Sequence, residues 1–177
     1  MSVEKRPTFV LDTSAIIYGF NPQLVDGDHF ITPRVMSELL GRKTKTITDL
    51  SISSGSLKVR APKEFFKEVA RTRAGSSGDI SVLSETDLEV VALALELKDE
   101  GADPVVISDD YSLQNVCTQL NIGFKPMMTK GISEEFWWFL YCPGCGATYK
   151  QSKSSICQVC GHTLKRKVYS KKHITNA

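Results

Sequence analysis

Short apolar runs alternate with helical patterns through the first 125 residues. Apolar strands are predicted at 8–11, 29–31, 57–59 and 105–107. Helices are predicted at 14–18, 33–40 and 44–53, from Pro62 onward, at 85–98 and after Asp110. This order predicts an α/β fold in which helices flank a central, mainly parallel sheet.

Three local signals refine these boundaries. Thr32 followed by Pro33 is typical of a helix N-cap and first helical position. Ser84 is predicted to cap the 85–98 helix, which carries an apolar face. The stretch RTRAGSSG at 71–78 is small, polar and basic, and we interpret it as a mobile surface loop.

The charge distribution divides the chain into two parts. Residues 141–177 contain seven Lys and Arg and no Asp or Glu, which leaves 15 basic and 20 acidic residues in 1–140. The formal net charge of +2 therefore hides an acidic body joined to a basic C-terminal segment. We predict a catalytic domain at 1–125, a linker at 126–136 and a second domain at 137–177, whose charge favours a polyanion as partner. A basic segment that serves only solubility is the alternative.

The sequence shows neither an export signal nor an apolar stretch of about 20 residues that could span a bilayer. A cytoplasmic protein without a membrane partner is therefore expected. In that setting cysteines are thiols or metal ligands rather than disulfides.

Four cysteines have the spacing of a metal site. Cys142 and Cys145 form one C-x2-C pair, Cys157 and Cys160 form a second, and a glycine follows each pair. Four thiolates in this arrangement suit tetrahedral Zn²⁺, and a site closed by four ligands has no position for catalysis. We predict a structural zinc ion that stabilises a small β ribbon; an iron ion on the same thiolates is the rival. Cys117, by contrast, is predicted to be a buried thiol.

Acidic residues recur where the predicted elements end. Asp12 ends the first strand, Glu38 lies on the second helix, Asp87 lies in the first turn of the 85–98 helix, and Asp109 and Asp110 follow the strand at 105–107. The C-terminal ends of parallel strands share one edge of a sheet. Carboxylates gathered there would suit Mg²⁺ or Mn²⁺, which can activate water for phosphodiester hydrolysis.

Each carboxylate also has a structural interpretation. Asp12 could cap a turn or helix, and Glu38 could lie on a solvated helix face. Ser84 and Asp87 fit a capping box, and Asp109 and Asp110 could start the following helix. The pattern alone leaves both interpretations open.

Four segments resemble the ordered motifs of PIN-domain ribonucleases: FVLDTSAII (9–17), TPRVMSELL (32–40), LSETDLEVVALALEL (83–97) and VISDDYSLQNV (106–116). With the Cys₄ ribbon, the chain resembles the archaeal group of these enzymes that matures the 3′ end of small-subunit ribosomal RNA. The resemblance implies a PIN-like domain in which Asp12, Glu38, Asp87 and Asp110 hold Mn²⁺ or Mg²⁺, with Asp109 in a variable position beside them. Ser108, Thr13 and Ser14 match the hydroxyl residues of the family.

The resulting hypothesis is a metal-dependent endoribonuclease for unpaired RNA. Its expected partners are the small-subunit rRNA precursor within the pre-small ribosomal subunit, and assembly factors. The ribbon, with Arg71, Arg73, Arg42, Lys43 and Lys45, is expected to hold flanking RNA. Two alternatives remain at this point: a non-catalytic rRNA-binding assembly factor, and a toxin-like nuclease that acts on tRNA or mRNA.

Overall fold

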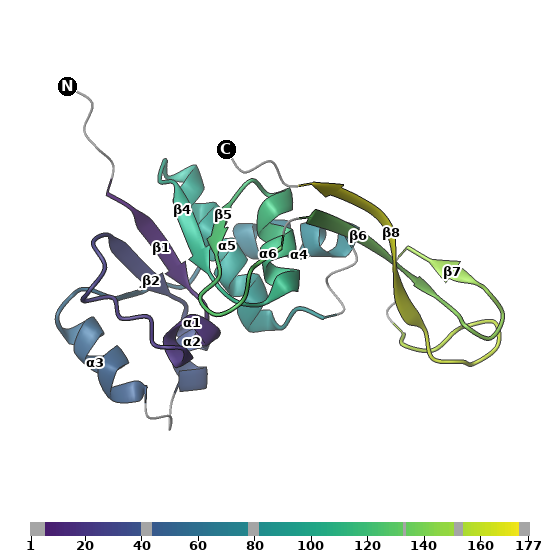
Figure 1. The fold of residues 1–177 in the computed structure, drawn as a ribbon, viewed down its shortest axis with the longest axis horizontal. Coiled ribbons are helices and arrows are strands. Elements are labelled where there is room, and N and C mark those ends of the chain that lie inside the picture. The colour runs from purple at the N-terminus through teal and green to yellow at the C-terminus, as the bar shows by residue number, and fades with distance from the viewer. Residues whose placement is uncertain (1–5, 40–43, 78–81, 133, 151–153, 174–177) are drawn as a thin grey trace.

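The computed structural model describes residues 6–39, 44–77, 82–132, 134–150 and 154–173 (Figure 1). It shows a body built around a sheet and an arm that projects from one side of the body (Figure 1). Within the described residues, no helix has both the length and the apolar character required to cross a bilayer.

The sheet of the body consists of five parallel strands. In spatial order they are β3 (Lys58–Val59), β2 (Asp28–Ile31), β1 (Thr8–Leu11), β4 (Pro104–Ile107) and β5 (Gly123–Lys125). The central strand β1 pairs with β2 on one side and with β4 on the other, so the strand order reverses between β1 and β4. The predicted parallel α/β architecture is confirmed.

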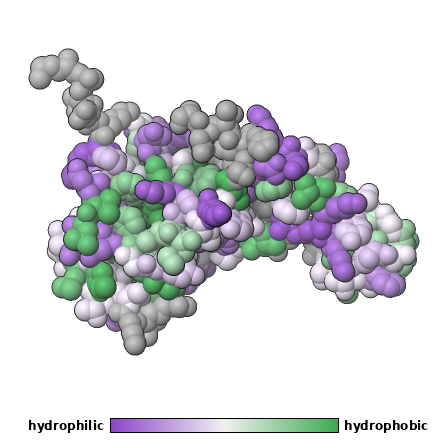
Figure 2. All heavy atoms as spheres, in the orientation of Figure 1, coloured by the Kyte–Doolittle hydropathy of each residue, from purple (hydrophilic) through white to green (hydrophobic). Residues whose placement is uncertain are grey.

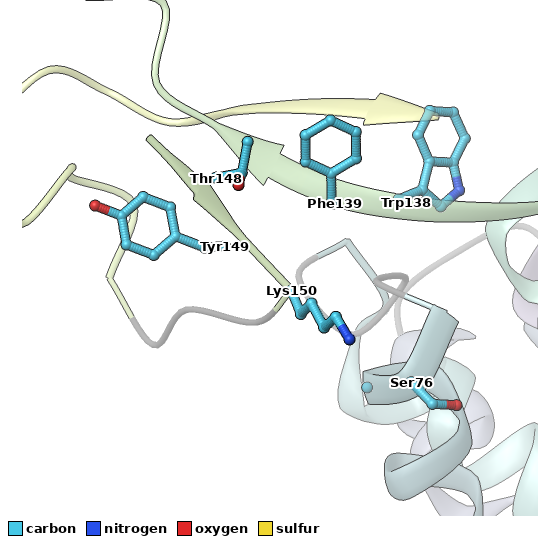
Figure 3. A pocket seen from close by; sticks show the side chains of 7 residues that line it. Ser76, Trp138, Phe139, Thr148, Tyr149 and Lys150 are labelled. Carbon is cyan, nitrogen blue, oxygen red and sulfur yellow. The ribbon is translucent and has the colours of Figure 1, made fainter. Parts of the chain in front are cut away.

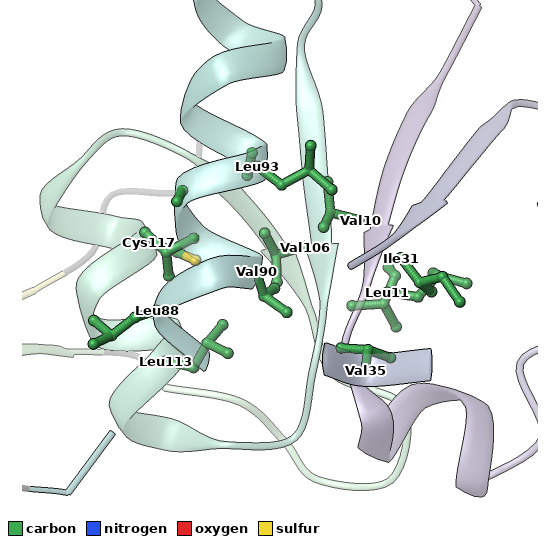
Figure 4. Close-up of a cluster of buried hydrophobic side chains, with 14 of the residues drawn as sticks. Val10, Leu11, Ile31, Val35, Leu88, Val90, Leu93, Val106, Leu113 and Cys117 are labelled. Atoms are coloured by element: carbon green, nitrogen blue, oxygen red, sulfur yellow. The ribbon is translucent and has the colours of Figure 1, made fainter. Parts of the chain in front are cut away.

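Among the described residues, six helices flank this sheet: α1 (Thr13–Ile17), α2 (Pro33–Leu39), α3 (Lys45–Ser53), α4 (Glu64–Ser77), α5 (Glu85–Asp99) and α6 (Tyr111–Gln119). Helix α5 is buried on almost every side, and its Val90 and Leu93 are fully inaccessible. Figure 4 shows these side chains packed toward Val10 and Val106 of the two central strands. This apolar core holds the strand ends, and the side chains that follow them, in fixed positions.

The predicted loop at 71–78 is wrong as far as Ser77, because α4 continues through it. Ala70 and Ala74, one helical turn apart, are both fully buried, and Arg71 pairs with Glu68 and Glu85. This packing and pairing outweigh the low helix propensity of Gly75 and the neighbouring serines. Gly78 lies outside the described residues.

The arm is a second sheet of three antiparallel strands. Strand β6 (Glu134–Tyr141) lies between β7 (Thr148–Tyr149) and β8 (Lys165–His173), and a bulge interrupts the β6–β8 pairing at Trp137 and Trp138. The predicted C-terminal β ribbon is thereby confirmed. Strand β6 begins within the segment that the sequence suggested as a linker.

Two buried amides of α6 attach this ribbon to the body. Asn115 donates a hydrogen bond to the carbonyl of Phe136 and accepts one from its amide, each at 2.7 Å. Gln114 accepts a hydrogen bond from the amide of Ile132 and donates one to the carbonyl of Ser108. Because α6 starts beside the strand ends, the same helix orients both the acidic edge and the first strand of the ribbon, β6.

We expect Asn115→Ala to destabilise this attachment, because it removes the hydrogen bonds to both backbone groups of Phe136 and leaves its carbonyl only the longer bond from Gln119, at 3.3 Å. A buried backbone group without a partner costs about 1–3 kcal/mol. Hydrogen–deuterium exchange should accelerate at 132–137 while the amides of β1 and β4 stay protected. Ser112→Ala, at a half-buried position on the same helix, is the control; equal exchange in the two variants would contradict this attachment.

Candidate active site and metal centre

The acidic residues predicted from sequence lie around one edge of the sheet. Asp12 follows β1 directly, and Asp109 and Asp110 follow Ser108 at the end of β4. These are the two strands between which the strand order reverses. In open parallel sheets such a point leaves a crevice beyond the strand ends, where ligands bind.

Asp12 is buried, with 6% of its surface exposed, and three donors hold its carboxylate. One oxygen accepts a hydrogen bond from the amide of Thr13 at 2.6 Å, which makes Asp12 the N-cap of α1. The other accepts from the hydroxyls of Ser14 and Ser108 at 2.7 and 2.9 Å. The side chain is therefore fixed in one orientation and linked to the end of β4.

Glu38 reaches this edge from α2 and bridges two threonines. One carboxylate oxygen accepts from the hydroxyl of Thr13 and the other from the hydroxyl of Thr86, both at 2.5 Å. Thr13 follows Asp12 and Thr86 precedes Asp87. Glu38 thus brings together two acidic residues that lie 75 positions apart.

Asp87 forms the predicted capping box with Ser84: each residue's side chain bonds to the backbone amide of the other. Burial raises the pKa of Asp87 above its ordinary value of 3.8, the hydrogen bonds from Ser84 lower it, and the negative charges of Asp12 and Asp110 raise it again. The net shift is upward. Asp87 is therefore close enough to Asp12 and to Asp110 to be repelled by both.

Asp110 and Asp109 point in different directions. Asp110 caps α6, since one oxygen accepts from the amides of Ser112 and Leu113. The capping interpretations of Asp12, Asp87 and Asp110 are thus confirmed. A cap of this kind uses one carboxylate oxygen and leaves lone pairs for a cation.

Both oxygens of Asp109 accept hydrogen bonds from the loop at 127–129, including the three backbone amides and the hydroxyl of Thr129. Burial raises the pKa of Asp109, but these bonds outweigh it, so the net pKa lies below its ordinary value. The geometry gives Asp109 the task of anchoring the loop, and does not support the expectation that it contacts a metal ion.

The donor set at this edge fits a hard divalent cation. It offers carboxylate oxygens, bears negative charges that repel one another, and includes neither histidine nor cysteine among the predicted ligands. Within the described part of the chain, these carboxylates do not approach one another as closely as the four cysteines described below. An ion held partly through water molecules suits this spacing, because Mg²⁺ keeps several waters when one or two carboxylates bind it.

We expect Asp87→Asn to stabilise the protein in the absence of divalent ions, by about 2–4 °C in Tm at pH 7. Because the pKa of Asp87 is raised on folding, its ionisation costs stability as pH rises above 3.8, and below that value the carboxyl is neutral in both states. Thermal denaturation from pH 3 to 8 should show the advantage growing with pH. With Mn²⁺ added, the parent should have the higher Tm of the two. Asp49→Asn, at an exposed position on α3, should alter neither the pH dependence of Tm nor its response to Mn²⁺. An advantage that shrinks with rising pH would contradict the raised pKa of Asp87, which burial and the neighbouring carboxylates produce.

The four cysteines meet at the far end of the ribbon, with their sulfur atoms all within 4.8 Å of one another. Each pair forms the same turn. In the first pair, the amide of Cys142 donates to the carbonyl of Ala147, and the amide of Gly146 donates to the carbonyl of Cys142. In the second pair, the amide of Cys157 donates to the carbonyl of His162, and the amide of Gly161 donates to the carbonyl of Cys157. The cluster therefore has the geometry of a metal site closed by four thiolates.

Glycine is required at the end of each turn. Gly146 and Gly161 have φ angles of 76° and 75°, which side chains other than glycine rarely adopt. His162 is exposed and packs over Gly144, where a Cβ would lie 2.7 Å from the imidazole. Cys117 is fully buried on α6, and burial raises the pKa of its thiol, which excludes a ready nucleophile.

Comparison with known proteins identifies the family. The family model described as "PIN domain of ribonuclease" matches residues 9–97. The chain belongs to the PIN-domain family of ribonucleases. The matched range includes Asp12, Glu38 and Asp87, so the predicted PIN-like nuclease is confirmed.

Several relatives of the PIN-domain chain match over most of its length. "Endoribonuclease Nob1" of Methanocaldococcus jannaschii is 37% identical over 161 residues, which are 90% of this chain and 77% of the relative. The protein of the same name from Pyrococcus abyssi is 38% identical over 88% of this chain and 91% of its own length. "Ribonuclease VapC1" of Thermoplasma acidophilum is 34% identical over 89% and 77%. These lengths take in most of the ribbon as well as the PIN domain.

The basic residues expected to contact RNA are placed differently. Arg71 forms ion pairs with Glu68 and Glu85, while Arg73 and Lys45 are exposed. Arg42 and Lys43 lie outside the described residues. Sequence reasoning missed Thr86, whose hydroxyl reaches Glu38; its place one residue before Asp87 gave no signal of that contact.

Proposed function

We propose that this PIN-domain protein is a divalent-metal-dependent endoribonuclease that cleaves unpaired RNA, and that its substrate is the 3′ end of the small-subunit rRNA precursor. The observation that carries the proposal is the bridge from Glu38 to Thr13 and Thr86, which draws the neighbouring Asp12 and Asp87 to one edge of the sheet. The repulsion of Asp87 by Asp12 and Asp110 supports it, because a cation would relieve that repulsion.

In this proposal Asp12, Glu38, Asp87 and Asp110 hold Mn²⁺ or Mg²⁺. Such an ion, when bound, would lower the pKa of a coordinated water and stabilise the charge that develops on the phosphate. Ser14 and Ser108 orient the Asp12 carboxylate, and Thr13 and Thr86 orient Glu38. Asp109 would act as a positioning residue that fixes the 127–129 loop beside the strand ends.

We also propose a structural and RNA-binding role for the ribbon. Zn²⁺ on the four cysteines would be structural, since a closed tetrahedral site leaves no ligand position for chemistry. The division into a catalytic domain at 1–125, a connecting segment at 126–136 and a ribbon domain at 137–177 belongs to this proposal. The basic ribbon would hold flanking RNA of the pre-small ribosomal subunit in the cytoplasm, where assembly factors would control access.

The substrate assignment is tested by offering three RNAs with Mn²⁺: a small-subunit rRNA 3′ precursor, a tRNA and an unstructured mRNA fragment. We expect cleavage of the precursor at a single site with a 3′-hydroxyl product. Cleavage of tRNA or mRNA in preference would indicate the toxin-like alternative. Tight binding of the precursor without any cleavage would indicate a non-catalytic assembly factor.

A further inference from the structure

A cavity of about 650 Å³ lies between the C-terminal end of α4 and the ribbon (Figure 3). Its walls come from both parts of the molecule: Ser76 from α4, and Trp138, Phe139, Thr148, Tyr149 and Lys150 from the ribbon. It does not include the acidic edge of the sheet. Its size falls within the range of about 300–1,000 Å³ that is usual for small-ligand sites.

The lining combines aromatic rings with one flexible cation. Figure 3 shows the Lys150 side chain extending from the end of β7 toward the helix end that carries Ser76. The hydroxyl of Tyr149 lies 3.3 Å from the sulfur of Cys157, so it is used within the ribbon. The other polar side-chain groups among the lining residues are the hydroxyls of Ser76 and Thr148, the indole N–H of Trp138 and the ammonium of Lys150.

The ribbon surface beside this cavity is basic. In the β6–β8 register Phe139 pairs with Lys167 and Tyr141 with Lys165, so aromatic and lysine side chains alternate across one face. Both lysines are exposed, and the Lys167 ammonium lies 6.0 Å from the Tyr141 ring. Figure 2 shows hydrophilic residues gathered along this part of the arm. Its charge is complementary to a phosphate backbone.

We propose that this cavity binds one unpaired nucleotide of the RNA substrate, with the base against Phe139 and the phosphate beside Lys150. The Arg166 guanidinium lies 4.4 Å from the centroid of the Trp138 ring, so Trp138 bounds the cavity beside the base. Aromatic side chains next to a positive groove are the usual means of holding unpaired RNA, because every base offers a π face. The inference rests on the proposed function for its substrate class. It adds a specific subsite, formed only where the catalytic domain and the ribbon meet.

The test measures binding of a short fluorescent oligouridine to the full-length, zinc-loaded chain without Mn²⁺ or Mg²⁺, so that no cleavage occurs. Phe139→Leu keeps an apolar side chain but removes the stacking plane, and should raise Kd about tenfold. Lys150→Gln should raise Kd and reduce the slope of log Kd against log salt concentration by about one, as expected for the loss of one phosphate contact. Ser76→Trp, which changes an exposed residue of α4, should weaken binding by filling the cavity from the opposite wall.

Lys58→Gln is the matched control: it removes one positive charge from the far edge of the sheet and should leave Kd within about twofold, since exposed ion pairs contribute little. Zinc content identifies any variant whose ribbon is disrupted. Parent-like binding by the Ser76, Phe139 and Lys150 variants, or no oligouridine binding by the parent, would overturn the inference. If the parent does not cleave RNA with Mn²⁺ but the three variants still bind oligouridine more weakly, only the proposed enzymatic function is overturned.

Discussion

Asp12→Asn is expected to lower Mn²⁺-dependent RNA cleavage by roughly a thousandfold, the effect of losing about 4 kcal/mol of transition-state stabilisation. Asp12 is the most buried of the four candidate metal ligands and the most firmly oriented, with donors from Thr13, Ser14 and Ser108. Asparagine has nearly the same shape but lacks the charge that attracts the cation.

The variant should stay folded. The amide oxygen of asparagine can still accept from the Thr13 backbone, and the hydroxyls of Ser14 and Ser108 can rotate to accept from the new amide group. Cleavage of the 3′ precursor should be measured alongside Tm and RNA affinity, which should change little. Asp49→Asn, exposed on α3, supplies the control for loss of one carboxylate. Parent-like cleavage by Asp12→Asn would show that the acidic edge is not the catalytic site.

Cys157→Ser is expected to abolish metal binding by the ribbon and to unfold its outer half. The buried residues of that half are few: Cys142, Cys157 and Leu164, with Leu140, Ala147 and Tyr149 packed beside them. Such a core is too small to be stable alone, whereas structural zinc contributes about 10–16 kcal/mol of binding free energy.

The measurement combines zinc content with amide NMR spectra. The parent should carry one zinc ion per chain, and the Cys157→Ser variant should lose it together with the dispersed signals of 142–165. Signals from β1 and α5 should persist, because their core is separate. Cys117→Ala changes a buried cysteine outside the ribbon cluster and should keep its zinc. A metal-free parent with a folded ribbon would contradict the structural role of the metal.

The fold could be predicted from sequence because its signals are local. Apolar runs marked β1, β2 and β4, and Thr32 with Pro33 marked the start of α2, where the Thr32 hydroxyl accepts from the amide of Val35. The extension of α4 was missed, since the helix is stabilised by partners far along the chain such as Glu85. The buried pair Ala70 and Ala74, at helical spacing, was the available signal.

The candidate site was predictable in its residues but not in its connections. The positions of Asp12 and Asp110 follow from the strands they end, whereas the Glu38 bridge depends on the hydroxyl of Thr86 meeting α2. The family resemblance separated Asp110 from Asp109, but the anchoring role of Asp109 could not be foreseen, because its orientation is set by the amides at 127–129. The attachment of the ribbon by Asn115 was also beyond sequence reasoning, since a buried amide carries no periodic signal.

The central claim is that side chains scattered over a hundred residues share a divalent ion at the end of β1 and β4. Anomalous scattering from crystals soaked in Mn²⁺ tests it most directly. We expect a manganese peak at this edge, coordinated directly or through one water by the side chains of Asp12, Glu38, Asp87 and Asp110. Manganese bound elsewhere, or absent from this edge in crystals of protein that cleaves RNA with Mn²⁺, would contradict it.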